Sequence, residues 1–169
     1  KASYSGNIVL NNFDIGTFLQ RKDIGKTTLN LDVDGVGFSK KYLNTVIKGD
    51  IAKLDYNKYT YNNIVVNGNF KLPYYKGKVS INDPNLNLNF DGLVDLSKRE
   101  NKYDFHINIE NSDLRKLKLV NDSISNFTGE AVVELSGNSL QNLHGNIYIK
   151  DAVYQNPKST YIFDEITVN

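Results

Sequence analysis

A long alternation of apolar and polar residues constrains the fold of this chain more than any other feature. Between positions 85 and 97 only Leu93 breaks the alternation, and the apolar parity holds Leu86, Leu88, Phe90, Gly92, Val94 and Leu96. Successive side chains of a strand point to opposite faces, so the pattern predicts a β-strand with one apolar and one solvated face. At about 3.3 Å per residue this strand would span roughly 36 Å, well beyond the usual strand of about 5–6 residues.

The same period of two recurs along the whole chain and predicts an all-β, mainly antiparallel protein. Pro73 and Pro84 mark strand ends and turns, because proline donates no hydrogen bond to a ladder. The predicted strands cover residues 4–10, 27–36, 45–56, 59–72, 75–82, 85–97, 102–110, 127–136, 144–153 and 161–168.

Two short segments have the spacing of a helical turn, and we expect them to cap an end or an edge of the sheet. Asn12 is the expected N-cap of the first and Ser112 that of the second. The apolar side chains that these turns would present are Ile15, Phe18, Leu19, Leu114 and Leu117.

Glycine recurs on the apolar parity of most predicted strands. Within a strand it commonly marks a bend or a close approach of two backbones. We therefore expect an elongated sheet that curls towards its apolar side, with a bulge where the phase slips at 51–52. The alternative is that hairpin and loop glycines share this parity by coincidence. The glycines concerned are Gly35, Gly49, Gly68, Gly77, Gly92, Gly129 and Gly145.

Composition excludes several classes of function. The 169 residues carry 20 basic and 19 acidic side chains, a net charge of +1, which is too balanced for a nucleic-acid-binding surface. The chain has no cysteine, which excludes disulfides, thiol nucleophiles and thiolate metal sites. No run approaches the ~18 apolar residues of a membrane-spanning helix. Without an initiating methionine, residues 1–169 are expected to form one segment of a longer protein.

The apolar face has two interpretations that periodicity cannot separate. In a closed β-sandwich, two such faces bury each other. In an open groove, the faces stay apart and line a trough that holds acyl chains. The expected lining residues are Leu29, Leu31, Val33, Ile64, Val66, Phe70, Val79, Ile81, Leu86, Leu88, Phe90, Val94, Leu96, Phe105, Ile107, Ile109, Val133, Leu135, Ile147 and Ile149.

Several segments resemble the TamB branch of the AsmA-like envelope proteins, in the form found in Bacteroidetes-type bacteria. The segments are FDIGTFLQRKDIGKTTLNLDVDGVGF (13–38), LNTVIKGDIAKLDYNKYTYNNIVVNGNFK (43–71), GKVSINDPNLNLNFDGLVDLS (77–97), DFHINIENSDLRKLKL (104–119) and GNSLQNLHGNIYIKDAVY (137–154). The resemblance covers nearly the whole chain, and YTYNNIVVNG with the following strand pair is its most specific part.

This resemblance implies a long periplasmic protein that is anchored in the inner membrane and folded as a curved β-taco, an open groove. Such proteins are implicated in phospholipid transport towards the outer membrane and in the assembly of outer-membrane proteins with a barrel partner. We expect the family's N-terminal anchor and C-terminal partner-binding domain to lie outside residues 1–169, which would contribute only the wall of the groove. The expected ligand is a phospholipid acyl chain, with no cofactor, metal or catalysis. The alternative is a closed β-sandwich that serves adhesion or glycan binding.

Other constellations favour plain structural roles. The sequence from Asp32 to Gly35 looks like the start of a calcium loop but lacks its further ligands. His106 and His144 have no carboxylate at metal-ligand spacing. Asp91 and Asp95 are expected on the wet face, away from any pocket that would raise a pKa.

Three surface features have both a functional and a purely structural interpretation. Leu114–Leu119 (LRKLKL) forms a small basic patch that could attract lipid head groups, although a solvated face is the simpler interpretation. Ser123, in the sequence Asp-Ser-Ile, resembles an O-glycosylation acceptor of Bacteroidetes-type periplasms. A tyrosine-rich zone could stack sugars or serve only as strand surface; its members are Tyr56, Tyr59, Tyr61, Tyr74 and Tyr75.

Overall fold

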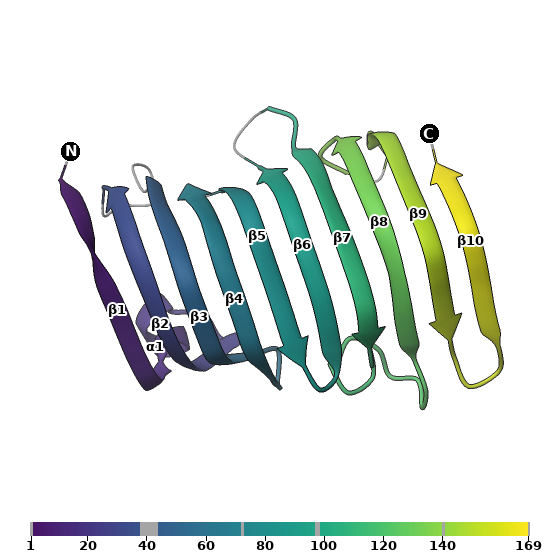
Figure 1. Ribbon diagram of the computed structural model, residues 1–169, viewed down its shortest axis with the longest axis horizontal. Helices are drawn as coiled ribbons and strands as arrows, with labels where there is room; N and C mark the ends of the chain where they lie inside the picture. Colours follow the sequence, from purple (N-terminus) through teal and green to yellow (C-terminus); the bar gives the residue numbers. More distant parts are fainter. Residues whose placement is uncertain (1, 38–43, 72, 97–98, 140, 169) are drawn as a thin grey trace.

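The protein is a single open sheet of ten antiparallel strands whose order in space is their order in the chain (Figure 1). The computed structural model describes residues 2–37, 44–71, 73–96, 99–139 and 141–168. The elements are β1 (Ser3–Asp14), α1 (Ile15–Leu19), β2 (Ile24–Val36), β3 (Asn44–Tyr56), β4 (Tyr59–Lys71), β5 (Tyr74–Asp83), β6 (Leu86–Asp95), β7 (Lys102–Ser112), β8 (Asn126–Ser136), β9 (His144–Gln155) and β10 (Thr160–Val168). The predicted all-β fold is confirmed.

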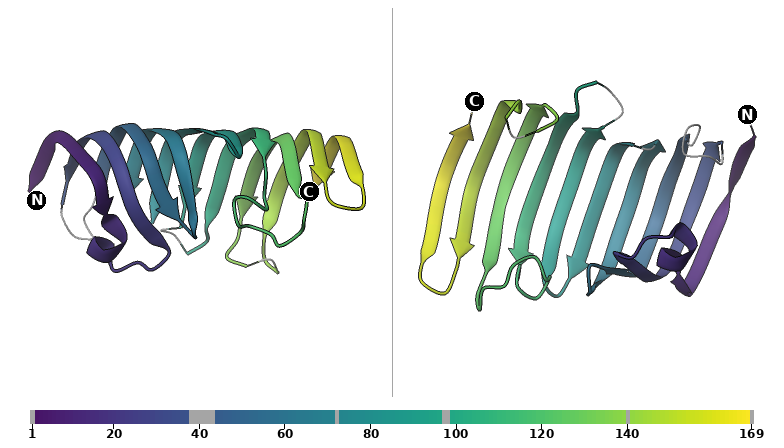
Figure 2. Two further views of the ribbon diagram at one scale, coloured as in Figure 1. Left: turned by 90° about the horizontal axis from the view of Figure 1, so that it is seen from below. Right: turned by 180° about the vertical axis from the view of Figure 1, so that it is seen from behind.

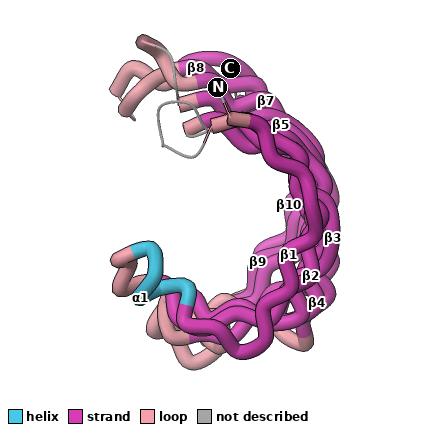
Figure 3. Tube along the Cα trace, turned by 90° about the vertical axis from the view of Figure 1, so that its left-hand side faces the viewer, coloured by secondary structure: helices cyan, strands magenta, loops and turns pink. Residues whose placement is uncertain are grey.

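The sheet is an elongated trough with a C-shaped cross-section, which is seen along its length in Figure 3. Strands follow one another along the long axis, so β1 and β10 form the two ends. Helix α1 and several connections between strands fold towards the hollow side, as the side and rear views show (Figure 2). Among the described residues no second sheet covers the first, which excludes the closed sandwich.

Strand positions agree with the sequence patterns to within a few residues at most ends. The largest difference is β1, which runs past the predicted end at residue 10. Asn12 forms a bulge there with a φ of +51°, and pairing with β2 resumes at Phe13. The predicted strand ends at 72 and 97 lie outside the described residues.

The first predicted helix exists as α1, but its capping residue is Asp14 and not Asn12. The Asp14 carboxylate accepts a hydrogen bond from the Thr17 backbone N–H at 2.9 Å. Asn12 cannot serve as the cap because it occupies the bulge of β1.

The second predicted helix is wrong. Ser112 is the last residue of β7, and its hydroxyl donates to the Phe127 carbonyl at 2.6 Å. Residues 114–118 form turns, in which the Asp113 carboxylate accepts from the Lys116 N–H at 3.0 Å. Ser112 also pairs with Leu86 in the ladder between β6 and β7, so the predicted N-cap position belongs to a strand.

Glycines and bulges allow the strands to bend. Gly68, Gly77 and Gly92 are register partners across β4, β5 and β6, so three of the predicted glycines form one contiguous row. The other glycines pair at other levels of the sheet. The bulge predicted at 51–52 is confirmed, since Ile51 pairs with Leu29 and Lys53 with Thr28, leaving Ala52 unpaired. A bulge bends its strand and increases the local twist.

Candidate functional site

The apolar parity faces the hollow side of the trough. Leu143, in the connection between β8 and β9, lines the same pocket as Phe105, Val133 and Leu135. That connection folds towards the hollow side (Figure 2, left), which places the pocket and these three side chains on the inside of the trough. Register partners share a face, which places the apolar parity of every other strand on the same side.

Register pairs join one residue of every strand into apolar rows that run along the trough. We call the first the central row; it contains Ile8, Leu31, Gly49, Val66, Val79, Phe90, Ile107, Ala131, Ile149 and Ile166. We call the second the upper row; it contains Gly6, Val33, Ile47, Gly68, Gly77, Gly92, Phe105, Val133, Ile147 and Val168.

No polar side chain interrupts either row. With neighbouring strands about 4.8 Å apart, each row extends roughly 43 Å from β1 to β10. Most of the lining residues expected from the sequence lie in these rows or in the adjacent pairs of Leu29, Ile64, Ile81, Leu88 and Ile109.

The lining is exposed too much to be a closed core. Of the twenty expected lining residues, five are buried, namely Leu29, Ile64, Val66, Leu86 and Val133. Leu96 lies beyond the end of β6 and is 42% exposed, and the others have intermediate exposure. A sealed sandwich would bury most of these side chains, so the exposures fit a trough open along one side.

Aromatic rings gather beside the glycine positions of the upper row. The ring centroids of Tyr75 and Phe90 are 6.2 Å apart, and those of Phe90 and Phe105 are 5.3 Å apart. The Tyr75 hydroxyl donates to the Lys78 carbonyl at 3.0 Å, so this ring lies along its own strand. Because the glycines of the upper row have no side chains, these aromatic rings can lie over the backbone there.

Asp83 organises the rim of the trough at the turn between β5 and β6. Its carboxylate accepts hydrogen bonds from the Tyr59 hydroxyl, from Asn62 through both the backbone and the side chain, and from the Asn85 backbone. Burial by itself raises the pKa of Asp83, but these donated hydrogen bonds outweigh burial and hold the pKa below its ordinary value. Burial, with the hydrogen bond to Asp83, raises the pKa of Tyr59. This network is a buried, satisfied polar cluster that sequence spacing did not predict.

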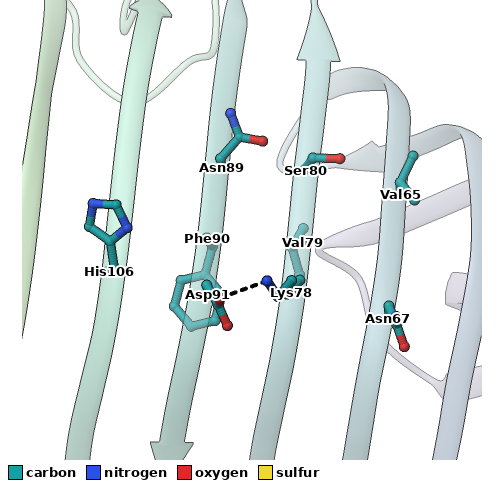
Figure 4. Close-up of a pocket in the computed structure, with 9 residues that line it drawn as sticks. All are labelled: Val65, Asn67, Lys78, Val79, Ser80, Asn89, Phe90, Asp91 and His106. Carbon is teal, nitrogen blue, oxygen red and sulfur yellow. Dashed lines mark ion pairs between the residues drawn. The ribbon is translucent and has the colours of Figure 1, made fainter.

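The convex face is mainly polar, although it exposes Val65, and it carries a shallow hollow of about 430 Å³ (Figure 4). Lys78 and Asp91 form an ion pair across it at 3.0 Å, and their side chains are 72% and 54% exposed. His106 lies at its margin, with Nε2 2.6 Å from the Glu130 carboxylate on the next strand. These groups are exposed to water, so the hollow has the character of a solvated surface.

The structure places the remaining polar residues as follows. Asp32 and Asp34 are exposed on β2, with no calcium-loop conformation. Asp91 is exposed as predicted, but the wet position predicted for Asp95 is wrong, because this residue is only 4% exposed. Among the described residues, no three or more histidine, aspartate or glutamate side chains lie close enough together to hold a metal ion.

The tyrosine zone is divided between the two opposite ends of strand β4. Tyr59 and Tyr61 pack edge to face at 4.8 Å near the turn between β3 and β4. Tyr74 and Tyr75 begin β5, beyond the opposite end of β4. Five tyrosines therefore do not form one stacking surface.

The basic patch at 114–119 is partly neutralised. Lys116 pairs with Asp113 at 3.1 Å, and Arg115 donates to the Ser123 carbonyl at 3.0 Å. Leu117 is buried beneath this turn, with 1% exposure. Ser123 lies in an exposed loop, where a glycan would meet no steric obstacle; its modification stays a prediction.

No known protein family, curated protein or solved structure matches this chain. Within the described residues, no helix has the length and apolar character needed to cross a membrane.

Proposed function

We propose that this chain is a non-catalytic wall segment of a lipid-conducting groove in the cell envelope, which carries phospholipid acyl chains between inner and outer membrane. The observation that supports the proposal best is the pair of uninterrupted apolar rows on the open side of a curved sheet. The sequence resemblance to TamB-like proteins supports the periplasmic setting and a role in outer-membrane biogenesis.

The lining suits transport better than tight binding. Each buried CH₂ group of an acyl chain contributes about 0.8 kcal/mol wherever it meets aliphatic surface. Apart from Gly49 and Ala131, the positions of the central row offer aliphatic or aromatic side chains, so a chain that shifts by one strand exchanges similar contacts at most positions. A charged head group would stay at the open side in water, because burying a charge without a partner is costly.

The alternative of a glycan-binding or adhesion module has less support. It was based on a sealed β-sandwich, and the described residues form an open sheet. The tyrosine zone that could bind sugars is divided between the opposite ends of β4.

Photo-crosslinking in cells tests the proposal directly. A photoreactive amino acid is placed in the full-length protein at Leu88 or Ile107, which line the groove. The control positions are the adjacent residues Asn87 and Asn108, whose side chains lie on the convex face. We expect lipid adducts at the first two positions and few at the other two. Equal labelling at all four positions, or no lipid adduct at Leu88 and Ile107, would contradict the conduit.

A further inference from the structure

Part of the groove wall is partly covered by a connection between strands and forms an open pocket there. Residues 137–139 and 141–143, in the connection between β8 and β9, lie against β7 and β8 and are called the roof. Together with the two strands the roof lines an open pocket of about 320 Å³, formed by Tyr103, Phe105, Val133, Leu135, Gly137, Asn138, Ser139 and Leu143. The volume lies at the lower end of the range for small-ligand sites, about 300–1,000 Å³.

Two asparagines hold this roof in place. The Asn138 amide accepts from the Asn101 N–H at 2.9 Å and donates to the Arg99 carbonyl at 2.7 Å. The Asn142 side-chain oxygen accepts from the N–H groups of Asn138 and Ser139 at 2.9 and 2.8 Å. The roof is therefore tied to the neighbouring connection between β6 and β7, and a ligand need not order it on binding.

The lining defines the chemistry of the ligand. Five of the lining residues present aromatic or aliphatic side chains. The polar groups are the amide of Asn138 and the hydroxyl of Ser139 on the roof, and the Tyr103 hydroxyl, which accepts from Asn101 at 3.4 Å. None of the described lining residues is lysine, arginine or histidine, so a free carboxylate would find no counter-charge. An uncharged, ester-linked alkyl chain meets no such penalty.

The pocket also communicates with the groove. Phe105 and Val133 line it and belong to the upper row, where Phe105 pairs with Gly92 and Val133 with Ile147. A chain that lies along the upper row can turn its end beneath the roof without leaving apolar surface.

We propose that this pocket holds the end of one acyl chain of a phospholipid, as a retention site within the groove. The inference rests on the proposed function, since it takes the groove to be the route by which the lipid arrives. It adds a defined position to a wall that otherwise offers equivalent contacts.

Photolabelling of the purified chain tests the retention site. The probe is phosphatidylcholine whose palmitoyl chain carries a diazirine at its terminal carbon, and adducts are mapped by mass spectrometry. The variant Leu143→Trp fills the pocket from the side of the roof. Leu119→Trp makes the same change in a connection at the opposite rim, where the side chain is 58% exposed, and serves as the control.

We expect adducts at Phe105 and Leu135 in the unmodified chain and in Leu119→Trp, and a loss of about tenfold or more in Leu143→Trp, since a changed hydrophobic pocket discriminates by that factor. Adducts at Leu88 and Ile107 should persist in all three proteins. Circular dichroism establishes that the variants are folded, and Leu143→Phe replaces Leu143→Trp if the latter is not.

The outcomes separate the two proposals. Adducts at Leu88 and Ile107 with none at Leu135, or labelling of Leu135 that Leu143→Trp leaves unchanged, overturn the retention site and leave the conduit intact. Labelling of Leu135 alone supports the pocket and contradicts the conduit. Labelling of the pocket by a free palmitic acid diazirine but not by the phospholipid also overturns the inference.

Discussion

Gly77 of β5 and Gly92 of β6 face each other as register partners, and neither position has space for a Cβ atom. A Cβ on Gly77 would lie 2.4 Å from the Asn67 carbonyl oxygen, and one on Gly92 would lie 2.4 Å from the Asp104 carbonyl oxygen. Their φ angles of +157° and +155° are rare for residues with side chains. The close approach of neighbouring backbones at these two positions therefore depends on the lack of side chains there.

The first prediction concerns this pair. Gly92→Ala should reduce the free energy of unfolding by about 1–3 kcal/mol, because the new methyl group meets the backbone of β7 and the φ angle becomes strained. The measurement is the midpoint of urea unfolding, followed by circular dichroism at constant protein concentration.

Gly6→Ala is the matched control, since an added Cβ there meets nothing within 4 Å. It should leave stability unchanged or raise it by up to about 1 kcal/mol through the entropy of the unfolded chain. Equal effects of both substitutions would show that Gly92 has no special role in the bend.

The faces of the sheet could be predicted from the sequence because the period of two is a local property of each strand. The distinction between groove and sandwich could not, because both need the same alternation. The curvature that favours a groove depends on the register between strands. Gly68, Gly77 and Gly92 must pair across neighbouring strands to form a row without side chains, and the pattern within one strand does not contain that pairing.

Contacts between distant residues were missed for the same reason. Glu130 lies 24 positions from His106 in sequence but 2.6 Å from its ring, because β7 and β8 pair in this register. Asp83 and Tyr59 meet through β4 and β5 in the same way. The second helix failed because the spacing of Leu114 and Leu117 fits a single turn as well as a helix.

The second prediction compares neighbouring residues on opposite faces. Ile64 is 6% exposed in the groove, and Val65 is 46% exposed on the convex face. Ile64→Ala should cost about 2 kcal/mol, near the lower end for buried aliphatic truncations, because the open trough lets neighbours and water relax into the space. Val65→Ala should change stability by less than about 0.5 kcal/mol. Similar losses in urea unfolding would mean that the two faces are equally buried.

The third prediction tests whether the convex face is separate from the groove. Glu130→Gln removes the charge beside His106, and both side chains are close to half exposed. Stability should change by less than about 1 kcal/mol, as for other surface ion pairs. Lipid crosslinking at Ile107, the next residue on the opposite face, should be unaffected. A large loss of crosslinking would show that the pair supports the groove.

The fourth prediction uses the lowered pKa of Asp83. A carboxyl group whose pKa is lower in the folded than in the unfolded protein stabilises the fold above its unfolded pKa, and this stabilisation disappears as the pH falls through the folded pKa. Asp83→Asn should therefore reduce stability at pH 7 by about 1.5–3 kcal/mol, the usual contribution of hydrogen bonds to a charged group. The amide replaces one acceptor oxygen by a donor that faces Tyr59 or Asn62.

The pH dependence distinguishes this charge effect from a simple loss of packing. Between pH 6 and pH 3, urea midpoints of the unmodified protein should fall more steeply than those of Asp83→Asn, so that the two curves converge in acid. Asp91→Asn, which breaks only the exposed pair with Lys78, should change stability at pH 7 by less than about 1 kcal/mol. Parallel curves for the unmodified protein and Asp83→Asn would mean that the Asp83 carboxylate does not stabilise the rim through its charge.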